Sequence, residues 1–322
     1  MKWASFILIF ISALNSAELR SQGVPSEDGN IPYLVTFGGN SLTSWGDDDF
    51  SQSFFFIVPP TCQEPIYIRI FDPDISGEID ELKGDFNTQT KFSIYGGKGC
   101  ISEKEAKGHI PESDRRSGNL LASETFGNDG KYDNDWYTFG PFDPSSGELV
   151  TEYGGYIFKV IADGKIGDDG NLYRYYLSTN PRSNKDVEGG NSFTFEYSFR
   201  LSDDPQQVSH IYPYIDPNVI SVKQRNFDWD NDGMIRIVSV AKKGDFVKVS
   251  SDNEWMESEH KITEQERGTS LDIRFIKDQS RTILNNNVVF YVKNQYGENL
   301  PFYTIPIGGT PNYKPTISAR KR

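Results

Sequence analysis

Short runs of aromatic and β-branched residues recur along the chain, and several of them alternate with polar residues at every second position. In the first two thirds these runs are SFFFIVP at 53–59, IYIRIF at 66–71, KFSIYG at 91–96, WYTFG at 136–140, GYIFKVIA at 155–162, LYRYYLS at 172–178 and SFTFEYSFRL at 192–201. A period of two places successive side chains on opposite faces, as in strands with one buried face. Turn residues separate the runs, and this spacing favours an antiparallel sandwich over βαβ units. The charged stretch at 102–119 is an exception, where we expect a short helix followed by a loop.

A proline-rich segment at 202–217 separates this series from a second one, which contains VISVKQ, MIRIVSV, DFVKVS, LDIRFIK, NVVFYVKN and PFYTIPI. Six or seven strands in roughly 95 residues suit an immunoglobulin-like sandwich. The pattern therefore predicts an all-β fold of two tandem antiparallel β-sandwich domains, a jelly-roll type at 31–205 and an immunoglobulin-like one at 206–312. We expect a flexible leader at 18–30 and a disordered tail at 313–322.

The N-terminus, MKWASFILIFISALNSA, has the three parts of a secretory signal peptide. Lys2 supplies the positive charge, Trp3 to Leu14 form the apolar segment, and Ala17 ends a stretch of small residues. We therefore expect cleavage after residues 1–17 and export to the periplasm, the cell surface or the extracellular medium. An uncleaved anchor is the alternative, although the apolar run is short for a membrane span. No transmembrane segment is expected in the mature chain.

The charge of the mature chain narrows the range of partners. Without residues 1–17 it has 32 Lys and Arg (33 minus Lys2) against 46 Asp and Glu, a net charge of −14. Such a surface repels phosphate backbones, so nucleic acid is not expected as a partner. The acids offer oxygen ligands to hard cations, or else they serve solubility alone.

Cys62 and Cys100 are the only cysteines in the sequence. In an oxidising compartment an even pair suggests one disulfide, which would stabilise by roughly 4 kcal/mol on the chain-entropy model. Two unpaired buried thiols are the alternative.

The run DPDISGEIDE at 72–81 has the spacing of a calcium-binding loop. Acidic and hydroxyl side chains at positions 1, 3, 5 and 9 can turn inward around an ion, and Gly77 at position 6 permits the bend. Position 12 is Lys83, so this is not an EF-hand, and an acidic hairpin turn is the alternative. The candidate ligands are Asp72, Asp74, Ser76 and Asp80 by side chain and Glu78 by its carbonyl.

The run DWDNDG at 228–233 is a second candidate calcium loop. Position 9 is Arg236, which cannot bind a cation, so water or Asp245 would have to complete the ligand shell. An acidic turn is again the alternative. The candidate ligands are Asp228, Asp230 and Asp232 by carboxylate and Met234 by its carbonyl.

Two further acidic clusters, NDGKYDND at 128–135 and ADGKIGDDGN at 162–171, are less specific. Their Asp-Gly and Asn-Asp pairs are also ordinary turn chemistry. The candidate metal ligands here are Asp129, Asp133, Asp135, Asp168 and Asp169.

The succession DNDWYTFGPF at 133–142, GGYIFKVIADG at 154–164 and GNLYRYYLS at 170–178 resembles the Asp-x-Asp-aromatic, Gly-Tyr-x-x-x-Val and Tyr-x-Leu pattern of bacterial pre-peptidase C-terminal (PPC) domains. The resemblance covers about 45–200 and implies a PPC-like first domain with calcium as its cofactor. PPC domains are small β-sandwiches attached to secreted enzymes, and some bind polymeric substrates. This chain differs by its insertion at 102–119 and shows no catalytic domain upstream, which puts an accessory role within one chain in doubt.

Sequence signatures of catalysis are absent. There is no G-x-S-x-G and no H-E-x-x-H, and His109, His210 and His260 are widely spaced. Paired carboxylates for glycoside hydrolysis stay open, because 46 acids leave many candidates. We expect a non-catalytic protein, with a secreted hydrolase or its accessory subunit as an alternative.

Four tryptophans next to acidic or polar turns suggest a ligand. Aromatic rings can stack on sugar faces, or they can close the ends of their own cores. The sequence therefore predicts an exported calcium-binding protein that binds a polysaccharide or a cell-envelope component. The alternative is a structural or adhesive surface protein that assembles with other protein chains through edge strands. The candidate ligand-binding residues are Trp45, Trp136, Trp229 and Trp255.

Overall fold

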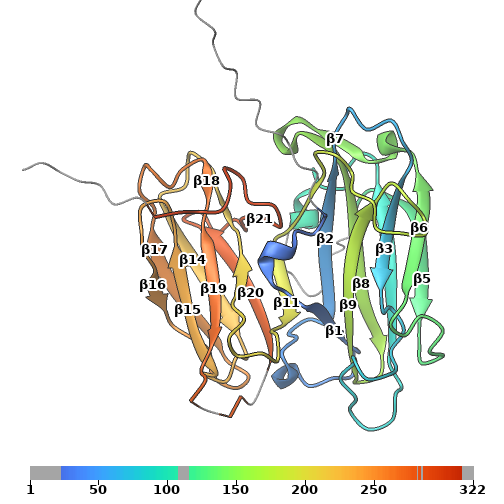
Figure 1. Cartoon of the computed structure of the whole chain (residues 1–322), viewed down its shortest axis with the longest axis horizontal. Coiled ribbons are helices and arrows are strands. Elements are labelled where there is room, and N and C mark those ends of the chain that lie inside the picture. Colours follow the sequence, from blue (N-terminus) through green and yellow to red (C-terminus); the bar gives the residue numbers. More distant parts are fainter. Residues whose placement is uncertain (1–22, 108–115, 281, 284–285, 314–322) are drawn as a thin grey trace, which may run out of the picture.

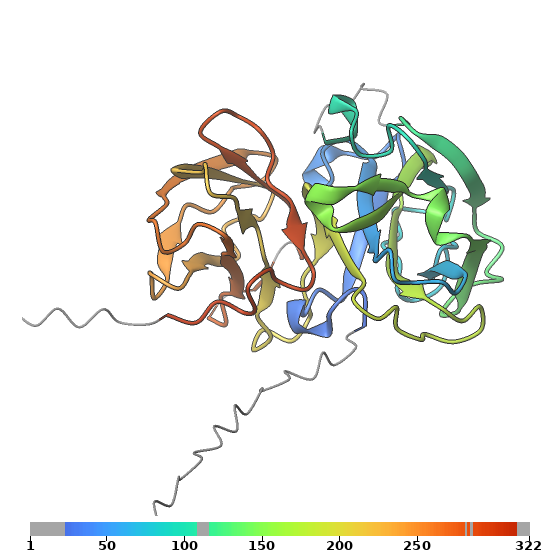
Figure 2. The same cartoon turned by 90° about the horizontal axis from the view of Figure 1, so that it is seen from above.

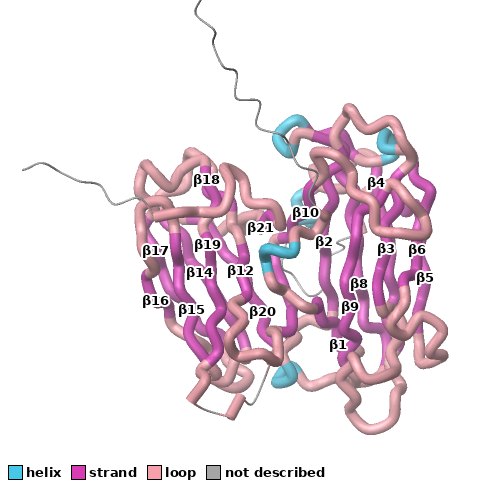
Figure 3. The backbone as a smooth tube through the Cα atoms, viewed as in Figure 1, coloured by secondary structure: helices cyan, strands magenta, loops and turns pink. Residues whose placement is uncertain are grey.

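The computed structural model describes residues 23–107, 116–280, 282–283 and 286–313. The predicted signal peptide, His109 and nearly all of the predicted tail lie outside the described residues. Within those ranges the fold is all-β, as predicted, and no helix is long and apolar enough to cross a membrane. The described helices are short 3₁₀ segments (Figure 3): η1 (Glu27–Gly29), η2 (Thr43–Trp45), η3 (Lys104–Lys107), η4 (Pro144–Ser146) and η5 (Thr151–Tyr153).

Two lobes lie side by side, with their strands running in similar directions (Figure 1). The first lobe contains β1 (Tyr33–Phe37), β2 (Ser51–Val58), β3 (Ile66–Phe71), β4 (Gln89–Gly96), β5 (Asn119–Phe126), β6 (Trp136–Phe142), β7 (Glu148–Val150), β8 (Gly155–Ile166), β9 (Gly170–Ser178), β10 (Asn191–Thr194) and β11 (Glu196–Arg200). The second contains β12 (Ser209–Ile211), β13 (Tyr214–Ile215), β14 (Ser221–Phe227), β15 (Gly233–Val238), β16 (Asp245–Val247), β17 (Trp255–Lys261), β18 (Thr269–Ser270), β19 (Asp272–Lys277), β20 (Asn287–Asn294) and β21 (Phe302–Tyr303).

An eight-stranded antiparallel sheet, in the order β17-β14-β20-β11-β1-β9-β3-β6, extends through both lobes. In the first lobe it packs against a sheet of order β21-β10-β2-β8-β4-β5, with β7 beside β8, and Phe54 stacks on Tyr175 with ring centroids 4.5 Å apart. In the second lobe it packs against the sheet β12-β19-β15-β16, where Phe290 meets Phe275 edge-on at 5.2 Å. Each lobe is therefore a sandwich, as Figure 2 shows from above.

Strand pairing crosses the predicted domain boundary near residue 205. β11 pairs with β20 over its whole length, and β21 returns to pair with β10. Buried side chains of both lobes form one cluster, in which Phe199 of β11 packs against Phe275 of β19 at 5.2 Å. Division into two independent domains stays a prediction, because the large sheet and the core both continue through this point.

The run 192–201, expected to be one strand, forms two strands in different sheets. The chain crosses between the sheets at Phe195, so Phe193 stacks on Phe55 with centroids 5.0 Å apart while Phe199 enters the main core.

The polar strands β5 and β17 gave no strand signal in the sequence. Both are edge strands, and a mostly solvated edge needs few apolar residues.

The predicted Cys62–Cys100 disulfide is wrong for this structure, since both residues are free thiols. Cys62 follows β2 and packs against the main core, whereas Cys100 is buried with Tyr95 and Ile161 in a separate small cluster. β8 lies between β2 and β4, and the two thiols belong to different clusters of the structure. Burial raises the pKa of Cys100 to about 12, so it is an inert core thiol.

Candidate functional site

Two acidic segments that are far apart in the sequence meet beside β3 and β6. These strands pair with Phe71 opposite Trp136, so the loop after β3 and the loop before β6 leave the sheet together. The Ser76 hydroxyl donates to Asp133 Oδ1 at 2.6 Å. The structure thus joins the run 72–80 to the separately predicted cluster at 128–135. We call Asp72, Asp74, Asp80, Asp129 and Asp133 the first acidic cluster.

Backbone N–H groups position the buried carboxylates of this cluster. Asp72 has a left-handed backbone with φ of 58°, and its Oδ1 accepts the N–H of Asn134 at 2.7 Å. Asp74 Oδ2 accepts the N–H of Tyr132 at 2.6 Å. Asp80 accepts N–H groups from Leu172 of β9 at 2.7 Å and from Ser76 at 2.9 Å. Both loops and β9 are therefore tied to the acids.

Two buried oxygens beside this cluster lack a hydrogen-bond donor. Asp72 is 1% exposed and its Oδ2 has no partner. The Oδ1 of Asn171, on β9, also has none, while the Nδ2 of the same side chain donates to the Pro73 carbonyl at 2.8 Å. Buried acceptors without donors are rare and call for an explanation, such as an ion.

The acids of the cluster repel one another's charge. Burial and the neighbouring Asp133 raise the pKa of Asp72 to about 6. Burial and the side chain of Asp129, which is within hydrogen-bonding reach, raise the pKa of Asp74 to about 6. Burial, with Asp72 and Asp133, raises the pKa of Asp80 to about 9. Additional positive charge would relieve this repulsion.

Other acids predicted as ligands have different surroundings. Glu78 is exposed, and Asp135 Oδ1 accepts the N–H of Trp136 at 2.7 Å. Asp169 is fully buried and clamps a loop, since it accepts N–H groups of Lys83, Asn87 and Thr88. The side chain of its neighbour Asp168 accepts from the amide of Asn87. The pair Asp168 and Asp169 therefore has a structural role in holding residues 83–88.

The second predicted loop places Asp228 and Asp230 together with Asp252, which the sequence analysis missed. Oxygens of these three acids lie within 4.8 Å of one another. Asp252 lies more than twenty residues downstream, beyond the reach of a loop pattern. Asp245 instead lies 3.7 Å from His260, and Met234 is in β15 opposite Ile276.

The run Asp47–Asp49 was also missed, although its three consecutive acids come within 4.8 Å of one another. Asp47 is buried, and its oxygens accept the N–H groups of Phe37 at 2.8 Å and Phe50 at 2.9 Å. These bonds fix the turn that leads into β2. Among the described residues, no three acids of the first acidic cluster place their oxygens within 4.8 Å of one another in the way that these two groups do.

The four predicted ligand-binding tryptophans differ in exposure. Trp229 is 0% exposed and packs on Phe275, so the prediction of a sugar-stacking ring is wrong for this residue. Trp45 lies beneath the Lys83 ammonium, 4.3 Å from its ring centroid. Trp255 lies beneath the guanidinium of Arg225, at 4.7 Å. Trp136 is half-buried and lines a cleft.

This cleft has a volume of about 400 Å³ and lies where the two lobes meet. Its walls come from the segment before β1, from β9 and β11 of the first lobe, and from β12 and β21. Its lining combines aromatic rings with a similar number of polar side chains, and both kinds of group occur in ligand sites. Of its lining residues, only Trp136 was predicted from the sequence as a ligand-binding residue.

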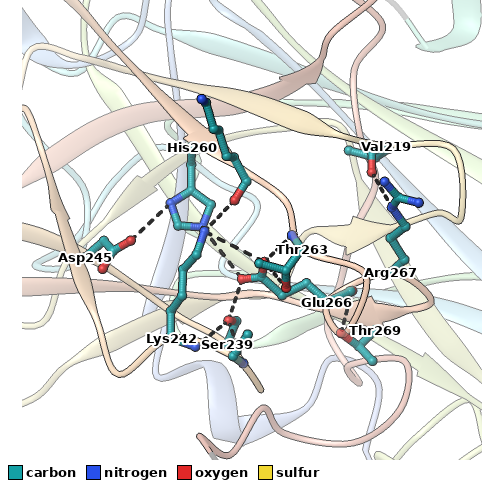
Figure 4. Close-up of polar contacts among 11 residues, drawn as sticks. Val219, Ser239, Lys242, Asp245, His260, Thr263, Glu266, Arg267 and Thr269 are labelled. Atoms are coloured by element: carbon teal, nitrogen blue, oxygen red, sulfur yellow. Dashed lines mark hydrogen bonds and ion pairs between the residues drawn. The ribbon is translucent and has the colours of Figure 1, made fainter. Parts of the chain in front are cut away.

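A second buried polar group lies in the second lobe, around Glu266 (Figure 4). This carboxylate is 0% exposed and accepts from the Ser239 hydroxyl at 2.5 Å and from the N–H of Thr263 at 2.7 Å. His260 Nε2 and Lys242 Nζ each lie 3.7 Å from it. Although burial opposes it, bonding to His260, Ser239 and Thr263 lowers the pKa of Glu266 to about 2.

Comparison with known proteins places the chain in no family. No family model matches it, and no curated protein matches it. A similar solved structure is that of a "putative secreted protein" from Parabacteroides distasonis, which is 12% identical over 88% of this chain and 97% of that one, with a TM-score of 0.21. The site is therefore interpreted from its own residues.

Proposed function

We propose that the protein is an exported, non-catalytic calcium-binding protein in which the first acidic cluster holds the ion. The observation that supports this best is the pair of buried oxygens, Asp72 Oδ2 and Asn171 Oδ1, that have no hydrogen-bond donor. Calcium binds six to eight oxygens from carboxylates, carbonyls and amides in adaptable geometry. It would neutralise the repulsion that, in addition to burial, raises the pKa of Asp72 and Asp74 to about 6 each.

The same ion would connect three parts of the first lobe. Asp72 and Asp74 follow β3, Asp129 and Asp133 precede β6, and Asn171 belongs to β9. Drawing these together would fix the loops at one edge of the large sheet. Calcium therefore acts as a structural clamp in this proposal, and the resemblance to PPC domains agrees with that role.

Thermal unfolding of the mature chain, residues 18–322, tests the proposal, first in chelator and then in about 10 mM calcium. Extracellular calcium modules have dissociation constants of roughly 0.1–1 mM. At a hundredfold excess over Kd, one site stabilises by about 2.7 kcal/mol, or very roughly 5–10 °C in Tm.

Asp72→Asn is the decisive variant, because it keeps the acceptor for Asn134 and removes the charge. We expect it to abolish the calcium-induced rise without lowering Tm in chelator. Glu78→Gln is the matched control, since it removes an exposed charge from the same loop and should retain the full rise. A rise that persists in Asp72→Asn, or no rise in the wild type, would refute calcium binding here.

A further inference from the structure

The cleft between the lobes results from a gap in the large sheet. β1 pairs with β9 from Leu34 to Phe37, and with β11 only at Tyr33 and Leu34. Before Tyr33 the chain leaves the sheet, so β9 and β11 lose their shared neighbour. The departing segment bridges the lobes, because the Val24 carbonyl accepts the N–H of Leu177 at 3.0 Å and the Asn30 carbonyl accepts the hydroxyl of Ser209 at 2.8 Å.

Half-buried aromatic rings lie at the mouth of this gap. Tyr33, Trp136 and Tyr176 line the cleft and are partly exposed. Trp136 and Tyr176 meet edge-on with centroids 6.4 Å apart, and the guanidinium of Arg69 lies 4.8 Å from the Trp136 ring. These contacts fix the rings in place, and rigid rings offer flat surfaces for the C–H faces of a sugar.

Three residues that line the cleft, Tyr175, Tyr197 and Thr304, belong to one row of neighbouring hydroxyls together with the buried Ser192. The hydroxyls of Tyr175 and Tyr197 are 3.4 Å apart, and the Tyr175 hydroxyl is 3.3 Å from that of Ser192. The Ser192 hydroxyl in turn lies 2.8 Å from that of Thr304. Thr304 is the partly exposed member of this row, and because a hydroxyl both donates and accepts, it can pair with a hydroxyl of a polyol.

His210 adds an oriented polar group to the wall of the cleft. Its Nδ1 lies 2.7 Å from Oδ1 of Asp272, whose other oxygen accepts from Arg274 Nε at 2.8 Å. This contact with Asp272 orients the imidazole ring, whose nitrogens can take part in hydrogen bonds. The ring stacks against Tyr212 with centroids 6.1 Å apart, which fixes its plane.

The charge of the residues that line the cleft favours neutral carbohydrates over charged ones. Among the residues that line the cleft, Glu27 is formally negative and Arg174 is formally positive, so their charges cancel. A chain with a net charge near −14 also repels anionic glycans at long range. A volume of about 400 Å³ lies near the lower end of the usual 300–1,000 Å³ for ligand pockets.

We infer that this cleft binds a neutral saccharide of one or two rings, with Trp136 as the stacking ring and the hydroxyl of Thr304 as a polar contact. The inference goes beyond calcium binding and rests on different residues. The two sites nevertheless share β9, since Asn171 borders the first acidic cluster and Tyr173 to Tyr176 line the cleft.

Saturation-transfer NMR and calorimetry on the mature chain test this, with neutral hexoses, N-acetylhexosamines and their α- and β-linked disaccharides as probes. We expect saturable binding of at least one of them. Trp136→Ala should weaken that binding at least about fivefold. Thr304→Val, which keeps the shape and removes one hydroxyl, should weaken it about two- to tenfold.

Trp255→Ala is the matched control, because Trp255 is also half-buried beneath an arginine, at 4.7 Å, but lies outside the cleft. It should leave affinity within twofold. The inference is overturned if no neutral probe binds at about 20 mM, if only charged sugars bind, or if Trp255→Ala weakens binding as much as Trp136→Ala. Calcium binding at the first acidic cluster is judged by the change in Tm alone. A sugar titration repeated in chelator therefore tests the cleft separately from that site.

Discussion

Each lobe contains a group of buried acids, and the surroundings of the two groups shift the pKa of their carboxyls in opposite directions. In the second lobe the Glu266 carboxylate has hydroxyl, backbone and cationic partners, and its pKa falls to about 2 despite burial. In the first lobe burial and the neighbouring acid Asp133 dominate around Asp72, and the pKa rises to about 6. Burial of a carboxylate therefore does not identify a binding site. The number of donors and cations around its oxygens distinguishes a completed structural network from a site suited to a cation.

The largest expected effect comes from breaking the completed network. Glu266→Gln leaves Lys242 without its buried counter-charge, so we expect a loss of roughly 3 kcal/mol in the free energy of unfolding. The calcium-induced rise in Tm should remain intact, because the change lies in the other lobe. Urea unfolding monitored by tryptophan fluorescence measures the loss. If Glu266→Gln were neutral while Asp72→Asn strongly destabilised the calcium-free protein, the comparison would be reversed.

The contribution to the pH dependence of stability should differ in sign between the first acidic cluster and Glu266. Folding raises the pKa of Asp72 and Asp74 from 3.8 to about 6 and that of Asp80 to about 9, so the folded state holds more protons and loses stability as pH rises through these values. For Glu266 the pKa falls from 4.5 to about 2, so stability is lost as pH falls through that window. In chelator, Tm should therefore be highest near about pH 4–5.

Calcium should oppose the decline above about pH 6, where the acids of the first cluster ionise and can bind it. Asp72→Asn should flatten the slope between about pH 4 and 6, and Glu78→Gln should not, because Glu78 is exposed. Scanning Tm against pH in chelator and in calcium tests both statements. A chelated protein that becomes steadily more stable from pH 5 to 9 would contradict the assignment of the first acidic cluster.

Local sequence patterns could predict the strands and the first loop, but not which distant residues the pairing of strands brings together. IYIRIF at 66–71 matches β3, because its alternation reflects one buried face. The meeting of Asp72 with Asp133 depends on β3 pairing with β6, which no local pattern encodes. Trp229 was misjudged for a related reason, since the adjacent acids suggested a surface position while β19 supplies Phe275 to cover the ring. The cleft was missed because its residues come from strands of both lobes.

The smallest expected effect concerns the second loop. It tests whether acids of the two lobes differ because of the lobe to which they belong or only because of their exposure to solvent. The second loop places Asp230 near Asp228 and Asp252, and burial together with Asp252 raises the pKa of Asp230. Asp230 and Asp252 are nevertheless partly or fully exposed, so solvent already screens much of their repulsion. Asp230→Asn should therefore reduce the calcium-induced stabilisation by less than about 1 kcal/mol. Comparing its Tm rise with that of Asp72→Asn measures this, and an equal loss in both variants would make the two loops equivalent calcium sites.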